Sequence, residues 1–225
     1  MKKIEIPEKL LKQYLNTGIL GIGEYHGVKE NYIFYETLLE SLPEIPNLAI
    51  EMKETERIEF DKFLNEKKID ESVLSKDGRL NIEFFNFLKK FKEKYPDKEI
   101  INFDEKDKNI EELKKLNKTR DEQMTDNLIS NIKKPLIIIA GNLHLQKNII
   151  NMGNRKIVTM GYLIKERIGD YPFISVVPLK GENFNFGINK LETIVDRNKN
   201  EFYEKEENKF LFFLENATPT TPFQV

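Results

Sequence analysis

The chain has 225 residues, 39% of them apolar, and a formal net charge of −2 at pH 7. This length suits one hydrophobic core, and the near balance of charge excludes a field that would draw the whole protein to nucleic acid or to an anionic membrane. The absence of cysteine excludes disulfides, thiolate metal ligands and a cysteine nucleophile. No segment approaches the roughly 18 apolar residues of a membrane span, and the charged N-terminus does not resemble a signal peptide. We therefore expect a soluble, cytoplasmic protein.

Hydrophobic periodicity predicts helices and strands that alternate along the chain. Apolar residues recur at helical spacing in residues 7–16, 28–41, 55–67, 81–95 and 108–132. Apolar runs predict strands at residues 19–23, 47–50, 99–103, 135–140, 156–160 and 173–177, with shorter ones at 184–186 and 210–214, antiparallel at the sheet edge. This order predicts an α/β protein of three-layer α/β/α architecture, with a mostly parallel sheet and helices on both faces.

The same pattern predicts one α/β domain over residues 1–215. Two helices in one crossover indicate that residues 55–95 form an insertion over the strand edge, as a lid or a substrate wall. The tail, residues 216–225, contains Pro219 and Pro222, and we expect it to be an extended arm or disordered.

Both histidines of the chain directly follow predicted strands. His26 comes two residues after Glu24, and side chains alternate in an extended segment, so the two point the same way. His144 follows residues 135–140, whose β-branched run is typical of a central parallel strand. The carboxyl ends of parallel strands meet at one edge of a sheet, where ligands bind. We therefore expect the rings of His26 and His144 to lie within about 10 Å of each other.

Two carboxylates follow further strands at the same edge. Glu51 follows residues 47–50, and Asp104 follows residues 99–103. Such a set can work as general acid and base, with a carboxylate orienting each imidazole. It can equally bind zinc or manganese, and the ligands would then be Glu24, His26, Glu51 and His144. For Asp104, which precedes a charged run, a merely solvated carboxylate is the favoured interpretation.

One face of the helix predicted at 108–132 carries Arg120, Met124 and Asn127, each about a turn apart. If this face packs on the crevice, Arg120 could hold a carboxylate or an oxyanion in bidentate fashion. From spacing alone an ordinary surface arginine is the favoured interpretation. Met124 is expected in the core in either case.

Four short blocks occur in order along the chain, and they are Gly23-Glu24-Tyr25-His26-Gly27 with Glu30, Ala49-Ile50-Glu51-Met52, Arg120-Asp121 with Met124, and Ala140-Gly141-Asn142-Leu143-His144. This series resembles the ordered motifs of the erythromycin esterase-like, ChaN-like and Tiki superfamily. The resemblance covers residues 19 to about 150. No block is specific alone, and the order and the strand or helix context carry the resemblance.

What the resemblance implies differs among the branches of that superfamily. The esterase-like members imply a hydrolase in which the histidine of the first block, here His26, is the base that activates water, with the acids and the arginine in support. The Tiki-type members imply a metal-dependent peptidase, and the ChaN-type members imply a haem-binding protein of iron uptake. The chain shows no signal or lipoprotein peptide as in the last group, and it is shorter than the esterases, so walls for a macrolide are not expected.

We expect a hydrolase of ester or amide type that acts on a small molecule or a peptide. With no cysteine and no G-x-S-x-G elbow to present a serine, water is the nucleophile. His26, oriented by Glu24 or Glu51, or a divalent metal would activate it. His144 would be the acid or a ligand, and Arg120 would stabilise developing negative charge. The alternative is a binding module that uses the same crevice for haem or a small anionic ligand. The oligomeric state is left open.

Overall fold

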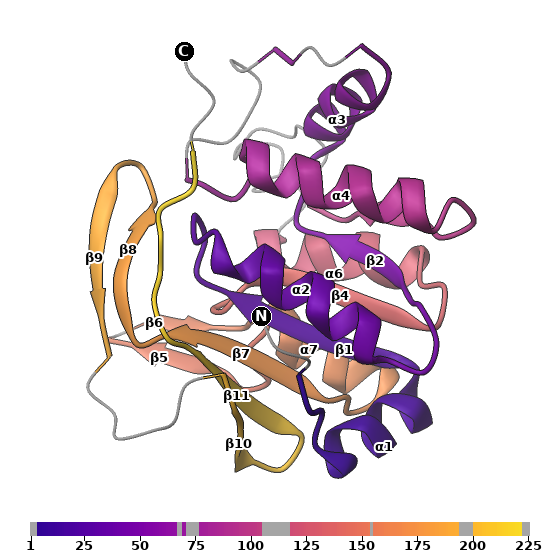
Figure 1. Cartoon of the computed structure of the whole chain (residues 1–225). Helices are drawn as coiled ribbons and strands as arrows, with labels where there is room; N and C mark the ends of the chain where they lie inside the picture. The colour runs from indigo at the N-terminus through magenta and orange to yellow at the C-terminus, as the bar shows by residue number, and fades with distance from the viewer. Residues whose placement is uncertain are drawn as a thin grey trace.

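The computed structural model describes residues 4–66, 69–70, 77–104, 118–153, 155–193 and 200–221. Within these ranges a seven-stranded sheet forms the middle layer, in the order β10-β11-β7-β1-β4-β2-β3 (Figure 1). Its strands are β1 (Ile19–Glu24), β2 (Asn47–Ile50), β3 (Ile100–Asn102), β4 (Leu136–Gly141), β7 (Phe173–Pro178), β10 (Phe202–Glu206) and β11 (Lys209–Leu214). Neighbouring strands are parallel except β10 and β11, which are antiparallel.

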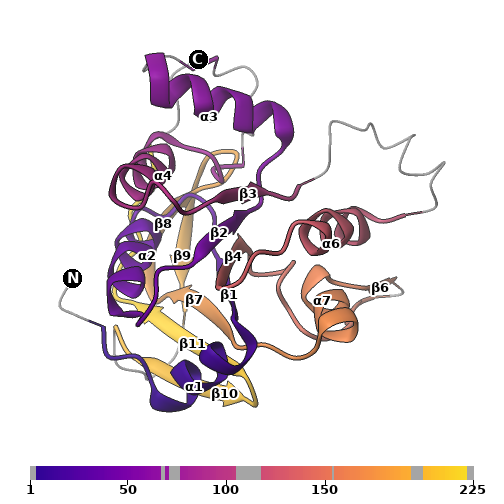
Figure 2. The same cartoon turned by 90° about the vertical axis from the view of Figure 1, so that its right-hand side faces the viewer.

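Helices cover both faces of the sheet, which Figure 2 shows between its two outer layers. The helices are α1 (Glu8–Thr17), α2 (Glu30–Ser41), α3 (Glu54–Glu66) and α4 (Ile82–Lys94) around one face, and α6 (Arg120–Ser130) and α7 (Met160–Ile168) on the other. Alternate residues of β4 supply both cores, since Ile137 and Ile139 pack toward the first group and Ile138 and Ala140 toward the second. The predicted three-layer fold is therefore confirmed.

The direction of winding reverses at β4. The chain passes from β1 through β2 to β3 over the face covered by α2, α3 and α4. It then returns to β4 through α6 on the opposite face. Consequently β4 lies between β1 and β2 although it is the last of the four in sequence. In doubly wound sheets the crevice above such a reversal, at the carboxyl ends of the strands, is where ligands bind.

The predicted helix 108–132 is wrong as a single element. The helix starts at Arg120, because Thr119 is extended (φ −80°, ψ 164°) and forms a capping box with Glu122. Residues 105–117 lie outside the described part of the chain. The Thr119-x-x-Glu122 spacing is itself a start signal for a helix, and it overrides the periodicity that runs through it.

The C-terminal third differs more from the prediction. The strand predicted at 156–160 ends as β6 (Arg155–Ile157), which pairs with β5 (Ile150–Met152), and α7 begins at Met160 instead. The strand predicted at 184–186 ends at Phe184, as β8 (Lys180–Phe184). The strand predicted at 210–214 is β11, which is antiparallel to the edge strand β10, as expected, and parallel to β7 on its other side. The segments 156–160 and 184–186 are short and mix apolar with polar residues, so their periodicity is weak.

A two-stranded hairpin of β8 and β9 (Ile188–Glu192) stands outside the main sheet. Its end rests on two glycines from distant parts of the chain. A Cβ at either Gly27 (φ +72°) or Gly78 (φ +79°) would lie 1.9 Å from the carbonyl oxygen of Phe184. Only glycine permits this approach, and only glycine adopts these angles without strain.

Residues 216–221 run along the turn after β1. Lys29 N donates to Thr218 O at 3.0 Å, and Thr220 N donates to Gly27 O at 3.0 Å. The single domain over 1–215 and a lid formed by 55–95 remain predictions. Within the described residues, no helix has the length and apolarity of a membrane span.

Candidate active site

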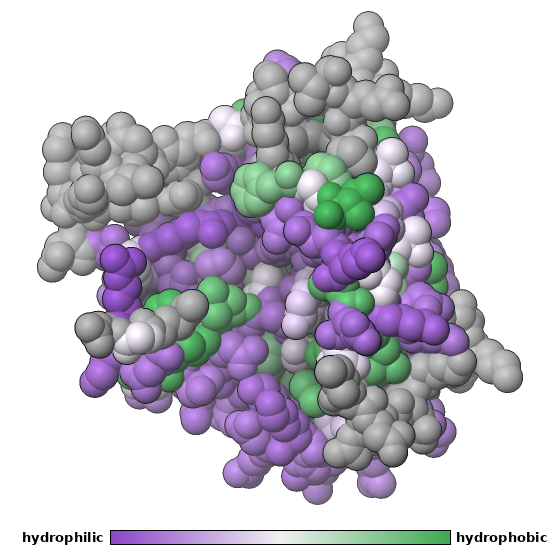
Figure 3. Space-filling view, turned by 90° about the vertical axis from the view of Figure 1, so that its left-hand side faces the viewer, coloured by the Kyte–Doolittle hydropathy of each residue, from purple (hydrophilic) through white to green (hydrophobic). Residues whose placement is uncertain are grey.

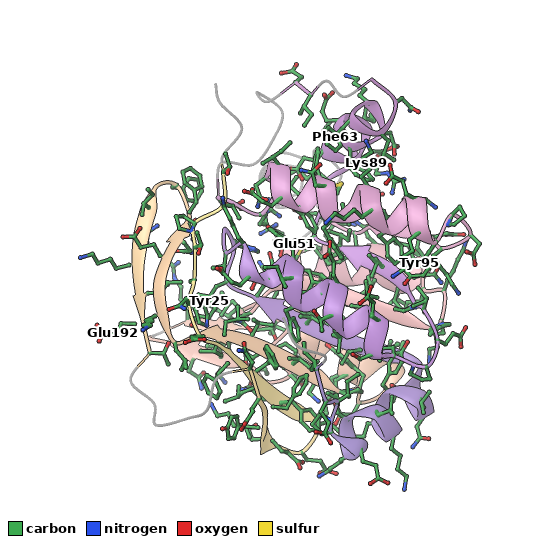
Figure 4. All side chains as sticks on the ribbon, viewed as in Figure 1. Tyr25, Glu51, Phe63, Lys89, Tyr95 and Glu192 are labelled. Carbon is green, nitrogen blue, oxygen red and sulfur yellow. The ribbon has the colours of Figure 1, made fainter. Side chains whose placement is uncertain are left out.

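The carboxyl ends of the central strands bring the candidate residues together. Glu24 is in register with Gly141 at the ends of β1 and β4. Glu51 N donates to Ile139 O at 3.2 Å, and Asp104 N donates to Met52 O at 3.2 Å. Figure 3 looks onto this edge and shows a hollow lined mainly by hydrophilic residues, with hydrophobic patches at its border. Glu51 itself lies inside the fold (Figure 4).

His26 is held by the glutamate that precedes it on the same face. Its Nδ1 lies 3.0 Å from Glu24 Oε1, and Glu24 is 7% exposed. The backbone is also fixed, because Asn183 Nδ2 of the β8–β9 hairpin donates to His26 O at 2.9 Å. With Nδ1 engaged, Nε2 is the ring nitrogen left for a ligand.

His144 is held in the same manner by Asp121, the residue after Arg120. Its Nδ1 lies 2.9 Å from Asp121 Oδ1, while Asp121 Oδ2 accepts from Met160 N at 2.8 Å. Burial lowers the pKa of His144, but the hydrogen bond to Asp121 and the charge of Glu51 outweigh it, and the net pKa is raised. This imidazole therefore tends to keep its second proton.

Both imidazoles meet over one glycine. A Cβ at Gly141 would lie 2.9 Å from His26 Nε2 and 3.6 Å from His144 Cδ2. The distance between His26 Nε2 and His144 Cδ2 cannot exceed the sum of these two distances. The two rings therefore lie well within the expected limit of about 10 Å of each other. Gly141 thus leaves room for two ring edges at the point where β4 ends.

Behind the histidines lies a buried network of two carboxylates and two guanidinium groups. Arg120 binds Asp104 with Nε at 3.1 Å and Nη2 at 2.8 Å, and Nη2 also reaches Glu51 at 2.9 Å. Arg79 Nη1 donates to Glu51 at 2.9 Å and to Asp104 at 2.8 Å. The second Glu51 oxygen accepts from Gly141 N at 2.9 Å.

The network fixes the charge of each member. Burial opposes the charged form of Glu51, but Arg79, His144, His26 and Arg120 outweigh it and hold the pKa of Glu51 far below its usual range. Burial likewise acts against Asp104, and the two arginines still lower its pKa. The carboxylates raise the pKa of both arginines in return, against burial. All four groups stay ionised.

Two expectations from the sequence are corrected here. Asp104 was expected to be solvated, but it is 2% exposed and paired with both arginines. Arg120 was favoured as a surface residue, but its guanidinium turns inward into the network, with Nη1 3.4 Å from His144 Nε2. Met124 is fully buried, and Asn127 donates to Asp104 O at 3.1 Å. The shared helix face therefore does pack on the crevice.

Sequence reasoning assigned no role to Asp121 and did not single out Arg79. Asp121 had a usable signal, since it is adjacent to Arg120 in a motif block. Arg79 had none, because it follows the Asp77-Gly78 turn in a polar loop. Its Nε also lies 2.8 Å from Asp77 Oδ2, and its side chain reaches the network from the segment between α3 and α4.

The proposed metal ligands do not fit a metal ion. Both oxygens of Glu24 and both of Glu51 are already hydrogen-bonded. Two guanidinium groups lie on Glu51 Oε1, and they would repel a divalent cation at that oxygen. Among the described residues no group of three or more histidine, aspartate or glutamate side chains is arranged to hold a metal.

No family model matches this sequence, and no curated protein does. Among solved structures, an erythromycin esterase mutant, EreC, in its open conformation aligns with a TM-score of 0.59 at 14% identity, over 84% of this chain and 79% of that one. This chain shares its fold with an erythromycin esterase. The esterase fold also recurs in a succinoglycan biosynthesis protein (TM-score 0.63, 13% identity, 95% and 91% coverage) and a Bacillus cereus protein (0.57, 13%, 95% and 93%). At these identities the likeness to the esterase establishes the fold.

Proposed function

We propose that the protein is a hydrolase of ester or amide bonds, with water as the nucleophile. The observation that carries this proposal is the pair of imidazoles over Gly141, each with its Nδ1 on a carboxylate. That arrangement brings His26 Nε2 and an edge of the His144 ring to the same glycine, so that one substrate can contact a base and an acid together. The fold shared with an erythromycin esterase supports the choice of ester bonds first.

The two histidines have different surroundings, and these suit different roles. His144 lies 3.7 Å from Glu51 and has a raised pKa because its bonds to Asp121 and the charge of Glu51 outweigh burial. It is therefore the general acid in our proposal. His26, whose partner is a single carboxylate, is the general base. A histidine whose pKa is raised by its surroundings suits the role of the acid.

The reaction then proceeds by attack of water. His26 Nε2 takes a proton from water while the oxygen attacks the carbonyl carbon, and the carbonyl oxygen becomes an oxyanion. Arg120 Nη1, near His144 Nε2, stabilises this developing charge. Collapse breaks the bond to the leaving group, and His144 gives it a proton, so that a carboxylic acid and an alcohol or amine result. Solvent restores both histidines to their starting protonation states.

The test is a panel of ester and amide substrates assayed with the full chain. We expect His26→Gln and His144→Gln each to lower kcat/KM about 10²- to 10⁴-fold, while Asn189→Ala on the outer hairpin strand leaves it unchanged. Full activity in a variant that lacks both imidazoles would overturn the proposal.

A further inference from the structure

Tyr35 places its hydroxyl group in the interior, directly behind the Glu24–His26 pair. The side chain belongs to α2 and is 1% exposed. Its ring packs edge-on against Tyr32, with ring centroids 6.0 Å apart, and at a tilt against Phe87, with ring centroids 5.6 Å apart. The hydroxyl donates a hydrogen bond to Glu24 Oε2. Glu24 therefore uses one oxygen for Tyr35 and the other for His26.

This contact constrains the protons around Glu24. Burial, followed by the charge of Glu24, raises the pKa of Tyr35 well above its ordinary value, so the hydroxyl remains a donor at all working pH values. A carboxylate can accept on both of its oxygens, and it has no hydrogen to donate. Ionised Glu24 can only accept from Nδ1 of His26, which requires the proton on Nδ1 and leaves the lone pair on Nε2.

We infer that Tyr35 is a positioning residue, which acts through Glu24 to fix the tautomer of His26 that can serve as a base. The inference rests on the proposed function for the role of His26, although the tautomer itself can be measured without any substrate. The Asp121–His144 pair has the same construction, since Met160 N donates to the far oxygen of Asp121. Of the two supporting donors, only the one on Tyr35 can be removed by a side-chain substitution.

The chain supplies a matched control for that substitution. Tyr32 lies on the same helix one turn before Tyr35 and is 5% exposed. Its hydroxyl accepts from Asn81 Nδ2 at 2.6 Å, and no hydrogen bond joins it to Glu24. Tyr32→Phe and Tyr35→Phe therefore remove the same buried group from the same helix, but only the second removes the donor to Glu24.

The experiment uses the fact that the chain has two histidines. In ¹⁵N spectra that correlate ring nitrogens with ring protons, we expect two imidazole patterns. The pattern that disappears in His26→Gln belongs to His26, and the one that disappears in His144→Gln belongs to His144. In the unsubstituted protein neutral His26 should show a protonated Nδ1 and a bare Nε2. Tyr35→Phe should convert this pattern to a mixture of tautomers and lower kcat/KM about tenfold or more. Tyr32→Phe should leave the His26 tautomer pattern and kcat/KM unchanged.

A second variant guards against a loss of folding. Glu24→Gln keeps the size of the side chain and can present its amide group to Nδ1, so it should favour the opposite tautomer, with the proton on Nε2. An unchanged His26 pattern in Tyr35→Phe alongside a changed one in Glu24→Gln would overturn the inference, as would an unchanged pattern in both variants or equal changes in Tyr35→Phe and Tyr32→Phe. A tautomer change without hydrolysis of any substrate would instead support the positioning and count against the proposed hydrolase.

Discussion

Arg79 and Arg120 donate hydrogen bonds to the same two carboxylate oxygens, Glu51 Oε1 and Asp104 Oδ2. The two arginines come from different segments, one between α3 and α4 and one at the start of α6. The two carboxylates follow neighbouring strands, β2 and β3. This pairing balances two negative charges with two positive ones in the interior, and it ties the helical segments to the sheet edge below the histidines.

Removal of Arg79 should destabilise the fold strongly. In Arg79→Met the apolar stem is kept, but Glu51 and Asp104 lose one of the two guanidinium groups that pair with them. Breaking a buried pair from one side costs about 3–5 kcal/mol, because a charge remains without compensation. Urea unfolding, with the free energy extrapolated to water, measures the loss.

The control for Arg79→Met is Arg167→Met, which breaks an exposed ion pair with Asp126. Exposed pairs contribute about 0–1 kcal/mol, so this variant should unfold close to the unsubstituted protein. If the two variants lost a similar amount of unfolding free energy, the buried network would not stabilise the fold more than an exposed ion pair does.

The stability contributed by His144 should depend on pH. Its pKa is raised in the folded state, since Asp121 and Glu51 outweigh the effect of burial. A raised pKa gives stabilisation that is complete below the ordinary histidine value of about 6.5 and is lost as pH rises through the folded-state value. The difference in melting temperature between the protein and His144→Gln should therefore shrink from pH 5.5 to pH 9. A difference that grows with pH contradicts this assignment.

The alkaline limb of the pH–rate profile should report the same group. Asp121→Asn removes the charge that helps to raise the pKa of His144 and leaves burial, which lowers it. A general acid with a lowered pKa loses its proton at lower pH, so the limb should move to lower pH. Profiles of kcat/KM for the two proteins on one substrate measure the shift, and superimposable limbs would exclude His144 as the acid.

A single methyl group at Gly141 should impair the site with little effect on folding. The backbone angle at this residue is one that alanine adopts readily, but a Cβ would lie 2.9 Å from His26 Nε2. In Gly141→Ala the ring must move, and a displacement of about 1 Å can cost 10²-fold in rate. Assays of kcat/KM and thermal melts separate the two effects. An active Gly141→Ala would mean that the position of His26 Nε2 is not critical.

Chelators should leave the activity intact. The carboxylates of the site are held by arginines, the histidines and backbone amides, so the proposed reaction relies on these groups. Assays after dialysis against EDTA, with and without added manganese or zinc, measure the effect. Activity that is lost in EDTA and restored by one of these ions would contradict the proposed mechanism.

The sequence indicated the sheet edge well, because strands are short apolar runs and their last residues are easily located. The position of four site residues at this edge could be predicted in this way, and they are Glu24, His26, Glu51 and His144. Asp104 lies at the same kind of position, but its partners come from elsewhere, so nothing local distinguishes a buried from a solvated carboxylate. Arg79 is harder still, since a polar loop gives no periodicity and its burial depends entirely on two carboxylates distant in sequence.

The position of Phe184 on Gly27 and Gly78 also limits how such proteins can be recombined. The three segments that meet there lie far apart in the chain, yet each must keep its local backbone for the others to fit. A chimera that exchanges only the β8–β9 hairpin with a structural relative needs a new hairpin whose backbone takes the same position against Gly27 and Gly78. Otherwise the two turns that contain these glycines have to be exchanged together with the hairpin. Crossover points in a library of hybrids should therefore leave residues 27, 78 and 184 together from one parent.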